Sequence, residues 1–524
     1  MSGAPALLQC AQRRAAALRD RYREAGFWSG QPADVVRAAA ALHPEKVALC
    51  ARGAELSYAE LDARIDAACG ALAASGVGAS TPTVVVVGND VDSVVAVHAA
   101  VRLDAVVLLV PRSAGETQVA DIIARTGAEF GVAPNWPAAP LKGVSAQLVW
   151  IALDADSAPQ TAYRPQRAAD EPCLVLYTSG TTSAPKGVIH SQSTLMKASS
   201  NYVAAAGLGP ADRIFLISPL ASVTGVLQAL VIAPMLCAPV VLEDNWDAAE
   251  TCELLVSSGA TWYGGPDRLL DRLLDEAVAR GLDVPLQAVY LGGTMLDRRI
   301  VTRIEDDFGI IVMRAYGSSE APVSTSGLRS ESAEARHADD GVALKDVEVK
   351  VGSAADPTEC CIRGPHTFLG YTDSDDDAQA FDGDWFRTGD VAEMSQGRVR
   401  IVGRLKDIII RNGLKIAAVE VEEAVARIAG VSNCAAYPVA DATTGERLAV
   451  AMVLDADADV DMSLAKVTDA LISAGLPKYK LPEELVFWNE PLPVNANGKV
   501  ERNKLAALSA GRPRVLADRL AATG

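Results

Sequence analysis

The chain is poor in positive charge and in aromatic residues, and its cysteines form no recognisable pattern. A formal net charge of −18 excludes the broad basic surface that nucleic acids and anionic membranes bind, so we expect neither as a partner. The nine cysteines are scattered and show no C-x-x-C spacing, which excludes the common zinc sites and disulfide frameworks. Reduced thiols in a cytoplasmic protein are the favoured interpretation.

The chain also lacks an uninterrupted membrane-spanning segment. Residues 214–242 carry no charge, but they contain Gly225 and prolines at positions 219, 234 and 239. Because these residues break helices, a buried strand–helix–strand unit is favoured over a membrane helix. Residues 11–23 are rich in Ala and Arg at helical spacing, which predicts an amphipathic surface helix rather than the apolar core of a secretory signal.

Apolar runs alternate with helical patterns through the first 310 residues. The 524 residues are too many for one hydrophobic core, so at least two domains are expected. Residues 82–88, 90–103 and 105–110 have the pattern of strand, helix and strand, which indicates a parallel sheet. Further strands are expected at 213–217, 239–242, 260–263 and 288–291, with helices at 251–258 and 267–280. The sequence predicts a large α/β domain.

Short alternating strands follow, at 347–351, 359–363 and 398–402, and they predict a small antiparallel sheet. The acidic residues 373–377 lack the EF-hand spacing, so a solvated turn is favoured over a calcium loop. From position 404 onwards we expect a small α+β domain, with helices at 419–429 and 464–475 and strands at 435–438 and 448–454. The predicted domains are therefore residues 1–403 and 404–524, with a frayed helical tail from position 511.

Residues 177–187, YTSGTTSAPKG, combine five Ser and Thr hydroxyls with one glycine between them and Lys186. Small residues let a backbone approach phosphates closely, and the hydroxyls and the lysine can then contact the phosphate oxygens. The segment is not a Walker P-loop, because Pro185 precedes the lysine and Gly187 follows it. A polyphosphate-binding loop is favoured, and a flexible surface turn is the alternative.

Five further segments rich in glycine, hydroxyl groups or charge follow in order, at 291–296, 315–321, 385–390, 403–407 and 493–499. Together with the loop, they resemble the motifs of the adenylate-forming superfamily: acyl-CoA synthetases, peptide-synthetase adenylation domains and beetle-type luciferases. The resemblance covers residues 56–505. It implies ATP, Mg²⁺ and coenzyme A as cofactors, an acyl-adenylate with release of pyrophosphate, and displacement of AMP by a thiol. It also implies a small C-terminal domain that is mobile.

The resemblance implies a role for individual residues. Lys186 would hold the β- and γ-phosphates, Tyr316 would stack on adenine, and Glu320 would bind Mg²⁺. The cofactor-binding set would comprise Thr178, Ser179, Gly180, Thr181, Thr182, Gly292, Gly293, Thr294, Ala315, Tyr316, Gly317, Ser318, Ser319, Asp390 and Arg404. In this set Ser319 would contact the α-phosphate, and Asp390 and Arg404 would contact the ribose.

The C-terminal region carries three further residues implied by the resemblance. Lys499 would bridge the substrate carboxylate and the α-phosphate, which makes it catalytic together with Glu320 and Lys186. Its alternative is a solvated surface lysine. Lys406 would lie at the hinge of domain rotation, and Gly413 would line the channel for coenzyme A.

The expected acyl pocket has small, uncharged walls. Its residues would be Ser222, Gly225, Tyr263, Gly264, Gly265 and Pro322. Small apolar walls favour a bulky cyclic or aromatic acid, and the absence of an acidic residue in 218–225 argues against an amino acid. His190 is either a neighbour of the pocket or a core residue.

Several functions are compatible with the sequence. The favoured one is an ATP-dependent ligase of a carboxylic acid and CoA. The sequence departs from the usual motifs at Ser222, Asn412, Lys415 and Ala418, so an enzyme specialised in the thioester-forming half is one variant. The alternatives are a stand-alone adenylation enzyme that loads a carrier protein and a non-catalytic nucleotide-binding regulator. A homodimer is left open.

Overall fold

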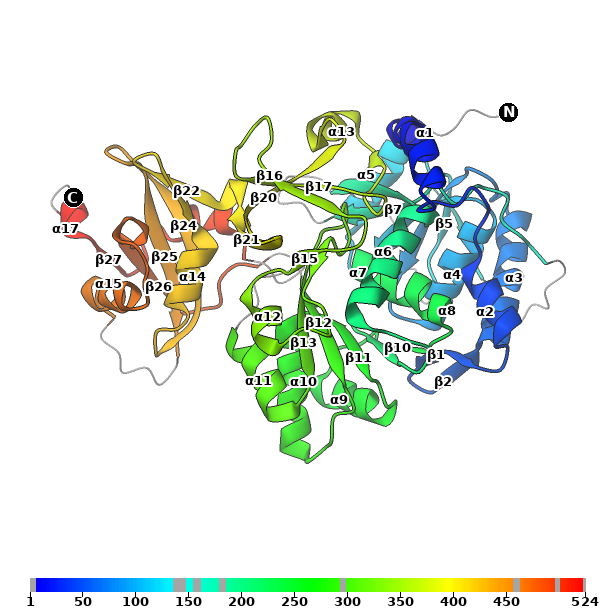
Figure 1. Ribbon diagram of the computed structural model, residues 1–524, viewed down its shortest axis with the longest axis horizontal. Coiled ribbons are helices and arrows are strands. Elements are labelled where there is room, and N and C mark those ends of the chain that lie inside the picture. The colour runs from blue at the N-terminus through cyan, green and yellow to red at the C-terminus, as the bar shows by residue number, and fades with distance from the viewer. Residues whose placement is uncertain are drawn as a thin grey trace. The chain divides into compact units, whose positions relative to one another are not determined.

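The computed structural model describes residues 6–134, 148–153, 162–178, 185–292, 298–455, 462–494 and 500–521 (Figure 1). The chain forms two compact units. Unit 1 comprises Met1–Val349, Ile362–Phe386 and Ser395–Val399, and unit 2 comprises Lys350–Cys361, Arg387–Met394 and Arg400–Gly524. The strands β16 (Glu348–Val351), β17 (Glu359–Arg363), β20 (Trp385–Ser395) and β21 (Arg398–Arg404) contribute residues to both units. The position predicted as the domain boundary, Arg404, is the last residue of β21.

Unit 1 contains a seven-stranded sheet in the order β18-β8-β7-β4-β3-β5-β6. The strands β3 (Pro82–Val87), β4 (Val106–Pro111), β5 (Phe130–Val132), β6 (Val149–Ile151) and β7 (Pro172–Thr178) run parallel. At one side of this sheet, β8 (Lys186–Ser191) pairs antiparallel with β7, and the edge strand β18 (Gly370–Tyr371) pairs antiparallel with β8. The valines and leucines of β3 and β4 are fully buried, as expected for a parallel strand covered on both faces, so the predicted strand–helix–strand unit is confirmed.

A second sheet of unit 1 has its parallel strands in the order β1-β10-β9-β11-β12-β13. Their bounds are β1 (Val47–Ala51), β9 (Ile214–Leu216), β10 (Val240–Leu242), β11 (Trp262–Gly265), β12 (Ala288–Gly292) and β13 (Ile311–Tyr316). The short strands β2 (Ala54–Ser57), β14 (Thr325–Ser326) and β15 (Val342–Ala343) pair antiparallel. Leucines of α10 (Asp267–Arg280) pack with buried residues of β11, β12 and β13 in one hydrophobic cluster, which confirms the predicted α/β architecture.

Residues 214–242 form the predicted buried strand–helix–strand unit. After β9 the chain passes through α7 (Val223–Gly225), a π-helix at Val226–Ile232 and α8 (Ala233–Leu236), and then enters β10. No helix in the described part of the chain is long and apolar enough to span a bilayer. All nine cysteines are free thiols, and seven of them are buried.

The other helices of unit 1 cover the sheets. They are α1 (Gln9–Glu24), α2 (Val35–Leu42), α3 (Tyr58–Ala74), α4 (Val91–Arg102), α5 (Glu116–Thr126), α6 (Gln192–Ala206), α9 (Ala248–Ser257), α11 (Arg298–Phe308), α12 (Ala333–Ala338) and α13 (Ser374–Ala380). The helix predicted at 11–23 is therefore confirmed as α1.

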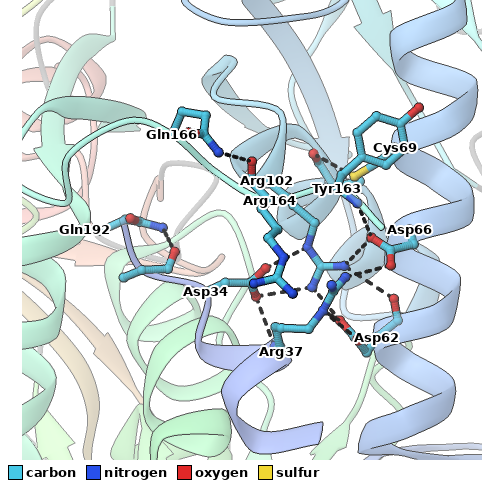
Figure 2. A network of polar contacts seen from close by, with 12 residues as sticks. Asp34, Arg37, Asp62, Asp66, Cys69, Arg102, Tyr163, Arg164, Gln166 and Gln192 are labelled. Atoms are coloured by element: carbon cyan, nitrogen blue, oxygen red, sulfur yellow. Dashed lines mark hydrogen bonds and ion pairs between the residues drawn. The ribbon is translucent and has the colours of Figure 1, made fainter. Parts of the chain in front are cut away.

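A buried ion-pair network joins α2, α3 and α4 (Figure 2). Arg102, whose side chain is 2 % exposed, lies 2.7 Å from Asp34, 2.6 Å from Asp62 and 2.9 Å from Asp66. Asp66 also accepts a hydrogen bond from the backbone N–H of Tyr163. A buried guanidinium with three carboxylates has its charge and its donors satisfied, so these contacts stabilise the packing of the three helices.

Two local predictions are wrong. The acidic residues 373–377 are solvent-accessible as expected, but they form the start of a helix and not a turn: Asp373 caps α13 by accepting hydrogen bonds from the N–H groups of Asp375 and Asp376. The predicted helical tail instead contains β27 (Arg514–Leu516), which pairs with β26 (Glu484–Trp488) before the short helix α17 (Asp518–Ala521). Caps and edge pairing depend on partners that composition alone does not specify.

Unit 2 has its own six-stranded sheet and hydrophobic clusters. Its strands are β22 (Ile408–Arg411), β23 (Leu414–Ala417), β24 (Val431–Asp441), β25 (Gly445–Leu454), β26 and β27. The helices α14 (Ala418–Val425) and α15 (Leu464–Ser473) contribute to one cluster, and α16 (Arg502–Leu508) contributes Leu505 to a second one. These elements confirm the predicted small α+β domain.

Candidate active site

The predicted phosphate loop connects two paired strands of the seven-stranded sheet. β7 ends at Thr178 and β8 begins at Lys186, and these residues face each other across the hairpin. The Thr178 hydroxyl is 3.5 Å from the Lys186 carbonyl oxygen. The remaining predicted loop ligands lie outside the described residues: Ser179, Gly180, Thr181 and Thr182. The hairpin therefore fixes both residues that flank this loop.

Lys186 contacts two side chains, one from β18 and one from α13. Its Nζ lies 2.6 Å from Asp376 Oδ1 and 5.1 Å from the centre of the Tyr371 ring. The side chains of Lys186 and Asp376 are 34 % and 31 % exposed. The ammonium group is therefore accessible to an anionic ligand, and it already has a carboxylate partner that such a ligand must compete with.

A tight turn follows β13 and carries the other predicted catalytic group. The Ser318 N–H donates to the Ala321 carbonyl, and the Ser324 N–H donates to the Tyr316 carbonyl. A Cβ at Gly317 would lie 2.4 Å from the backbone nitrogen of Val323, so this close approach requires glycine. The compact turn therefore fixes the backbone position from which the Glu320 side chain projects.

The Glu320 side chain is held from outside the turn. Its Oε1 accepts a hydrogen bond of 2.7 Å from the Tyr371 hydroxyl. The backbone carbonyl of Glu320 accepts a 2.7 Å hydrogen bond from the N–H of Phe368. Lys186 and Glu320, which are 134 positions apart in the sequence, thus share Tyr371 as a neighbour.

The Glu320 carboxylate fits a magnesium ion that keeps most of its water. Among the described residues no group of three or more His, Cys, Asp or Glu side chains could enclose a metal. Magnesium in nucleotide sites commonly needs only one or two protein carboxylates, because phosphate oxygens and water complete the shell. The hydrogen bond from Tyr371 uses Oε1 of Glu320, and Oε2 is the second carboxylate oxygen that a metal ion could share.

His190 contacts the backbone of the same turn. Its ring is fully buried, with Nε2 2.7 Å from the Ser319 carbonyl oxygen and Nδ1 3.0 Å from the Thr194 hydroxyl. Burial lowers the pKa of His190 to about 4. Because both ring nitrogens are engaged by groups of the protein itself, we interpret His190 as a residue that supports the turn.

The predicted adenine-binding residues lie at the carboxyl ends of two adjacent strands. Gly292 ends β12 and faces Ala315 of β13, and Tyr316 is the last residue of β13. A Cβ at Gly292 would lie 2.7 Å from the Ala315 carbonyl oxygen. Gly293 and Thr294 lie outside the described residues. Strand ends of this kind are where open α/β sheets bind ligands.

The predicted acyl-binding glycines are packed against the protein's own side chains. The Gly264 carbonyl accepts hydrogen bonds from Gln228 Nε2, at 3.0 Å, and from Ser218 Oγ, at 3.3 Å. A Cβ at Gly264 would lie 2.5 Å from both Gln228 Nε2 and the Tyr202 hydroxyl. A Cβ at Gly225 would lie 2.3 Å from the Pro219 carbonyl oxygen. These two glycines therefore have packing roles, which weakens the inference of an open pocket from their size.

The other predicted acyl-binding residues have different surroundings. Tyr263 is fully buried in a hydrophobic cluster, and its hydroxyl donates to the Pro266 carbonyl at 2.8 Å, so its ring belongs to the core. Ser222 caps α7 by accepting from the Gly225 N–H. Gly265 ends β11 beside Leu291 of β12, and Pro322 is buried in the turn after β13.

Unit 2 brings together the two predicted ribose ligands. Asp390 lies in β20, Arg404 ends β21, and Arg404 Nε is 3.3 Å from Asp390 Oδ1. The Asp390 side chain is 13 % exposed and the Arg404 side chain is 49 % exposed, so the pair has an accessible edge. A carboxylate beside a guanidinium can accept from vicinal hydroxyls while the guanidinium donates to them.

Two other predicted residues of unit 2, Lys406 and Gly413, follow Arg404 closely in the sequence. Lys406 is in the 3₁₀ turn η4 (Leu405–Asp407) directly after Arg404. Asn412 and Gly413 form the hairpin turn between β22 and β23, and both have positive φ, of 51° and 76°. Asn followed by Gly suits a type I′ turn, so Asn412 is compatible with this hairpin geometry. Lys499 lies outside the described residues.

Sequence reasoning did not identify Tyr371, Asp376 or Gln228. Tyr371 lies 51 positions from Glu320, and Asp376 stands in a run of acidic residues that resembled a solvated surface. Gln228 is a single amide in an apolar segment. No local pattern marks such residues, because their roles come from contacts between distant segments.

An α/β body in which a hairpin leads into a predicted Ser/Thr phosphate loop, with a lysine beside it and a carboxylate after a strand end, is typical of enzymes that bind a nucleotide. The comparison with known families agrees with this class. The chain belongs to the AMP-binding enzymes: residues 36–372 match the family described as AMP-binding enzyme, and residues 420–499 match the AMP-binding enzyme C-terminal domain.

Known relatives of this chain include CoA ligases. It is 29% identical over 381 residues to the oxalate–CoA ligase of Arabidopsis thaliana, covering 70% of this chain and 73% of that protein. It is 27% identical over 542 residues to a salicylyl-CoA synthase / salicylate adenylyltransferase of Streptomyces sp, covering 94% and 96%. The fold is similar to that of the anthranilate CoA ligase AuaEII in complex with anthranoyl-AMP, with a TM-score of 0.83, 19% identity, and coverage of 92% and 98%.

Proposed function

We propose that this protein is an ATP-dependent ligase that joins a carboxylic acid to coenzyme A through an acyl-adenylate. The observation that supports it most is the meeting of Lys186 and Glu320 at Tyr371, directly beside the hairpin that bears the predicted phosphate loop. A lysine and a carboxylate placed before ATP arrives suit a reaction whose main difficulty is negative charge on the phosphates.

The first half-reaction joins the acid to AMP. A carboxylate oxygen of the substrate forms a bond to the α-phosphorus of ATP, and the bond from that phosphorus to the pyrophosphate oxygen breaks. In this proposal Lys186 neutralises the leaving pyrophosphate, Ser319 contacts the α-phosphate, and Lys499 bridges the two reacting groups. Magnesium, held by Glu320, would supply further neutralisation of the phosphate charge.

The second half-reaction forms the thioester. The sulfur of coenzyme A bonds to the acyl carbonyl carbon, the bond to the phosphate oxygen breaks, and AMP leaves while the thiol loses its proton. Lys406 would allow the C-terminal domain to rotate between the two halves, and Gly413 would line the path of coenzyme A. Asp390 and Arg404 would hold the ribose during both halves.

For the substrate we propose a bulky cyclic or aromatic acid. The uncharged segment 218–225 and the near full-length relative that acts on salicylate support this class. The glycines at 225 and 264 do not, since both have packing reasons to be small. The relative named as an oxalate–CoA ligase makes small dicarboxylates the competing class, so both classes belong in one assay.

A panel of substituted benzoates, cyclic aliphatic acids and small dicarboxylates tests the proposal in two assays. One assay measures pyrophosphate release with ATP, and the other measures CoA esters formed from presynthesised acyl-adenylates. Products in both assays support the full ligase, whereas esters from the adenylates alone indicate an enzyme of the second half-reaction. Acylation of a carrier protein while CoA stays inert would support the alternative of a stand-alone adenylation enzyme. If no product forms in any of these assays, the proposal is refuted.

A further inference from the structure

Tyr371 occupies a special position between the two predicted catalytic groups. Its hydroxyl lies 2.7 Å from Glu320 Oε1, and its ring lies 5.1 Å below the ammonium group of Lys186. The residue is 6 % exposed. One buried side chain thus contacts a carboxylate with its polar end and a cation with its aromatic face.

Tyr371 is itself held rigidly by its neighbours. It pairs with Val188 in the β18–β8 ladder, and its backbone N–H donates to Asp377 Oδ1 at 3.1 Å. Its ring packs edge to face on the buried ring of Phe368, with 4.9 Å between the ring centres. A side chain fixed by a strand, a hydrogen bond and a ring contact has little freedom to leave Glu320.

The chemistry of the tyrosine suits an orienting role. A hydroxyl that donates to an ionised carboxylate forms a short, strong hydrogen bond, and it occupies one of the two carboxylate oxygens. A tyrosine hydroxyl ordinarily loses its proton only at about pH 10, so at neutral pH the Tyr371 hydroxyl is a donor to the Glu320 carboxylate. The other carboxylate oxygen is then directed away from Tyr371.

We infer that Tyr371 is a positioning residue, which orients Glu320 toward the magnesium ion of the nucleotide and braces Lys186 beside the phosphates. The inference rests on the proposed function. Hydrogen-bond partners of metal-binding carboxylates commonly affect metal affinity about 10-fold to 100-fold when they are removed. The cation–ring contact of Lys186 is accessible to solvent and contributes less, about twofold to fivefold in affinity.

The test is the Tyr371→Phe variant, which removes the hydroxyl but keeps the ring. Binding of the non-hydrolysable analogue adenylyl imidodiphosphate is measured by calorimetry at increasing Mg²⁺. We expect the Mg²⁺ concentration for half-maximal binding to rise about 10-fold or more, with AMP binding in the absence of divalent cations unchanged. Tyr371→Leu, which also removes the ring, should weaken analogue binding about twofold to fivefold further without an additional change in the Mg²⁺ requirement.

Tyr58→Phe is the matched control. The Tyr58 hydroxyl is buried and donates to the backbone carbonyls of Ala233 and Ala238, away from Glu320. Its loss should lower thermal stability and leave the Mg²⁺ requirement unchanged. A shift below twofold in Tyr371→Phe, or an equal shift in Tyr58→Phe, overturns the inference.

Failure of the proposed function has a different readout. In that case the wild-type protein binds no adenylyl imidodiphosphate at any Mg²⁺ concentration. Should Tyr371→Phe not fold, 3-fluorotyrosine at position 371 provides a conservative probe. Its fluorine resonance should shift when Mg²⁺ is added to the analogue complex, and a resonance that does not move would overturn the inference.

Discussion

The contact between Lys186 and Asp376 predicts that removing a charged side chain beside a predicted catalytic group increases the affinity for nucleotide. If Lys186 binds the β- and γ-phosphates, it must exchange Asp376 for them, so removing the carboxylate should strengthen nucleotide binding. The Asp376→Asn substitution keeps the size of the side chain and removes its charge. The expected effect is therefore an increase in affinity for ATP, although the residue contacts a predicted catalytic group.

The magnitude follows from distance and exposure. The 2.6 Å contact would be strong in a dry interior, but both side chains are about one third exposed. Ion pairs that water and salt screen to this extent contribute about 0–1 kcal/mol. Because 1.4 kcal/mol corresponds to a factor of 10, removing the competing Asp376 carboxylate should raise ATP affinity by at most about fivefold. The gain should shrink as ionic strength rises.

The assay compares Asp376→Asn with Asp375→Asn by calorimetric titration. Both substitutions remove one negative charge from the first turn of α13, but only Asp376 contacts Lys186. We expect tighter binding of adenylyl imidodiphosphate in Asp376→Asn alone. Binding of AMP, which lacks the β- and γ-phosphates, should be unchanged in both variants. Equal affinities for the analogue, or weaker binding in Asp376→Asn, would refute the reasoning.

Three further predictions concern catalysis, packing and pH. Lys499→Ala should lose most pyrophosphate release with ATP and keep most ester formation from presynthesised adenylates; an equal loss in both assays contradicts the role given to this lysine. Gly264→Ala should lower the free energy of unfolding by about 1–3 kcal/mol, because its Cβ would lie 2.5 Å from two buried polar atoms. Gly209→Ala, whose added Cβ would meet nothing within 4 Å apart from the adjacent residues, should have little effect in the same denaturant titration. Burial lowers the pKa of His366 to about 3, below the unfolded value near 6.5, so its contribution to stability is complete above pH 6.5 and is lost as pH falls toward 3. The melting temperature of His366→Gln should therefore depend less steeply on pH across that window, and parallel curves would count against this assignment.

Much of the fold could be predicted because burial imposes periodicity on the sequence. The helix expected at 267–280 is α10 with the same bounds, since its leucines recur at helical spacing and meet the sheet. The strand expected at 82–88 is β3, because a strand buried on both faces is a continuous apolar run. The short elements α13 and β27 were missed, because a capping carboxylate and an edge pairing decide them.

The candidate site could be predicted only where its residues stand in local motifs. Composition indicated the phosphate loop, and the resemblance to a known superfamily indicated Glu320. The roles of Tyr371 and Asp376 depend on the contacts of β18 with β8 and of α13 with Lys186, which no local motif marks. Gly264 was interpreted as part of an open pocket, yet the Gln228 amide and the Tyr202 hydroxyl lie against it. The sequence shows that Gly264 is small, but only the structure shows that this space is filled by side chains of the protein itself.

The division of the chain into six alternating segments constrains how hybrid enzymes can be built from this protein. Unit 2 includes Lys350–Cys361 and Arg387–Met394 in addition to everything from Arg400 onward. A chimera joined at one point near residue 400 would combine two inserted segments of one parent with the C-terminal domain of another. If all three segments of unit 2 are exchanged together, every residue of a unit comes from the same parent protein. Such chimeras should express better than hybrids with a single crossover.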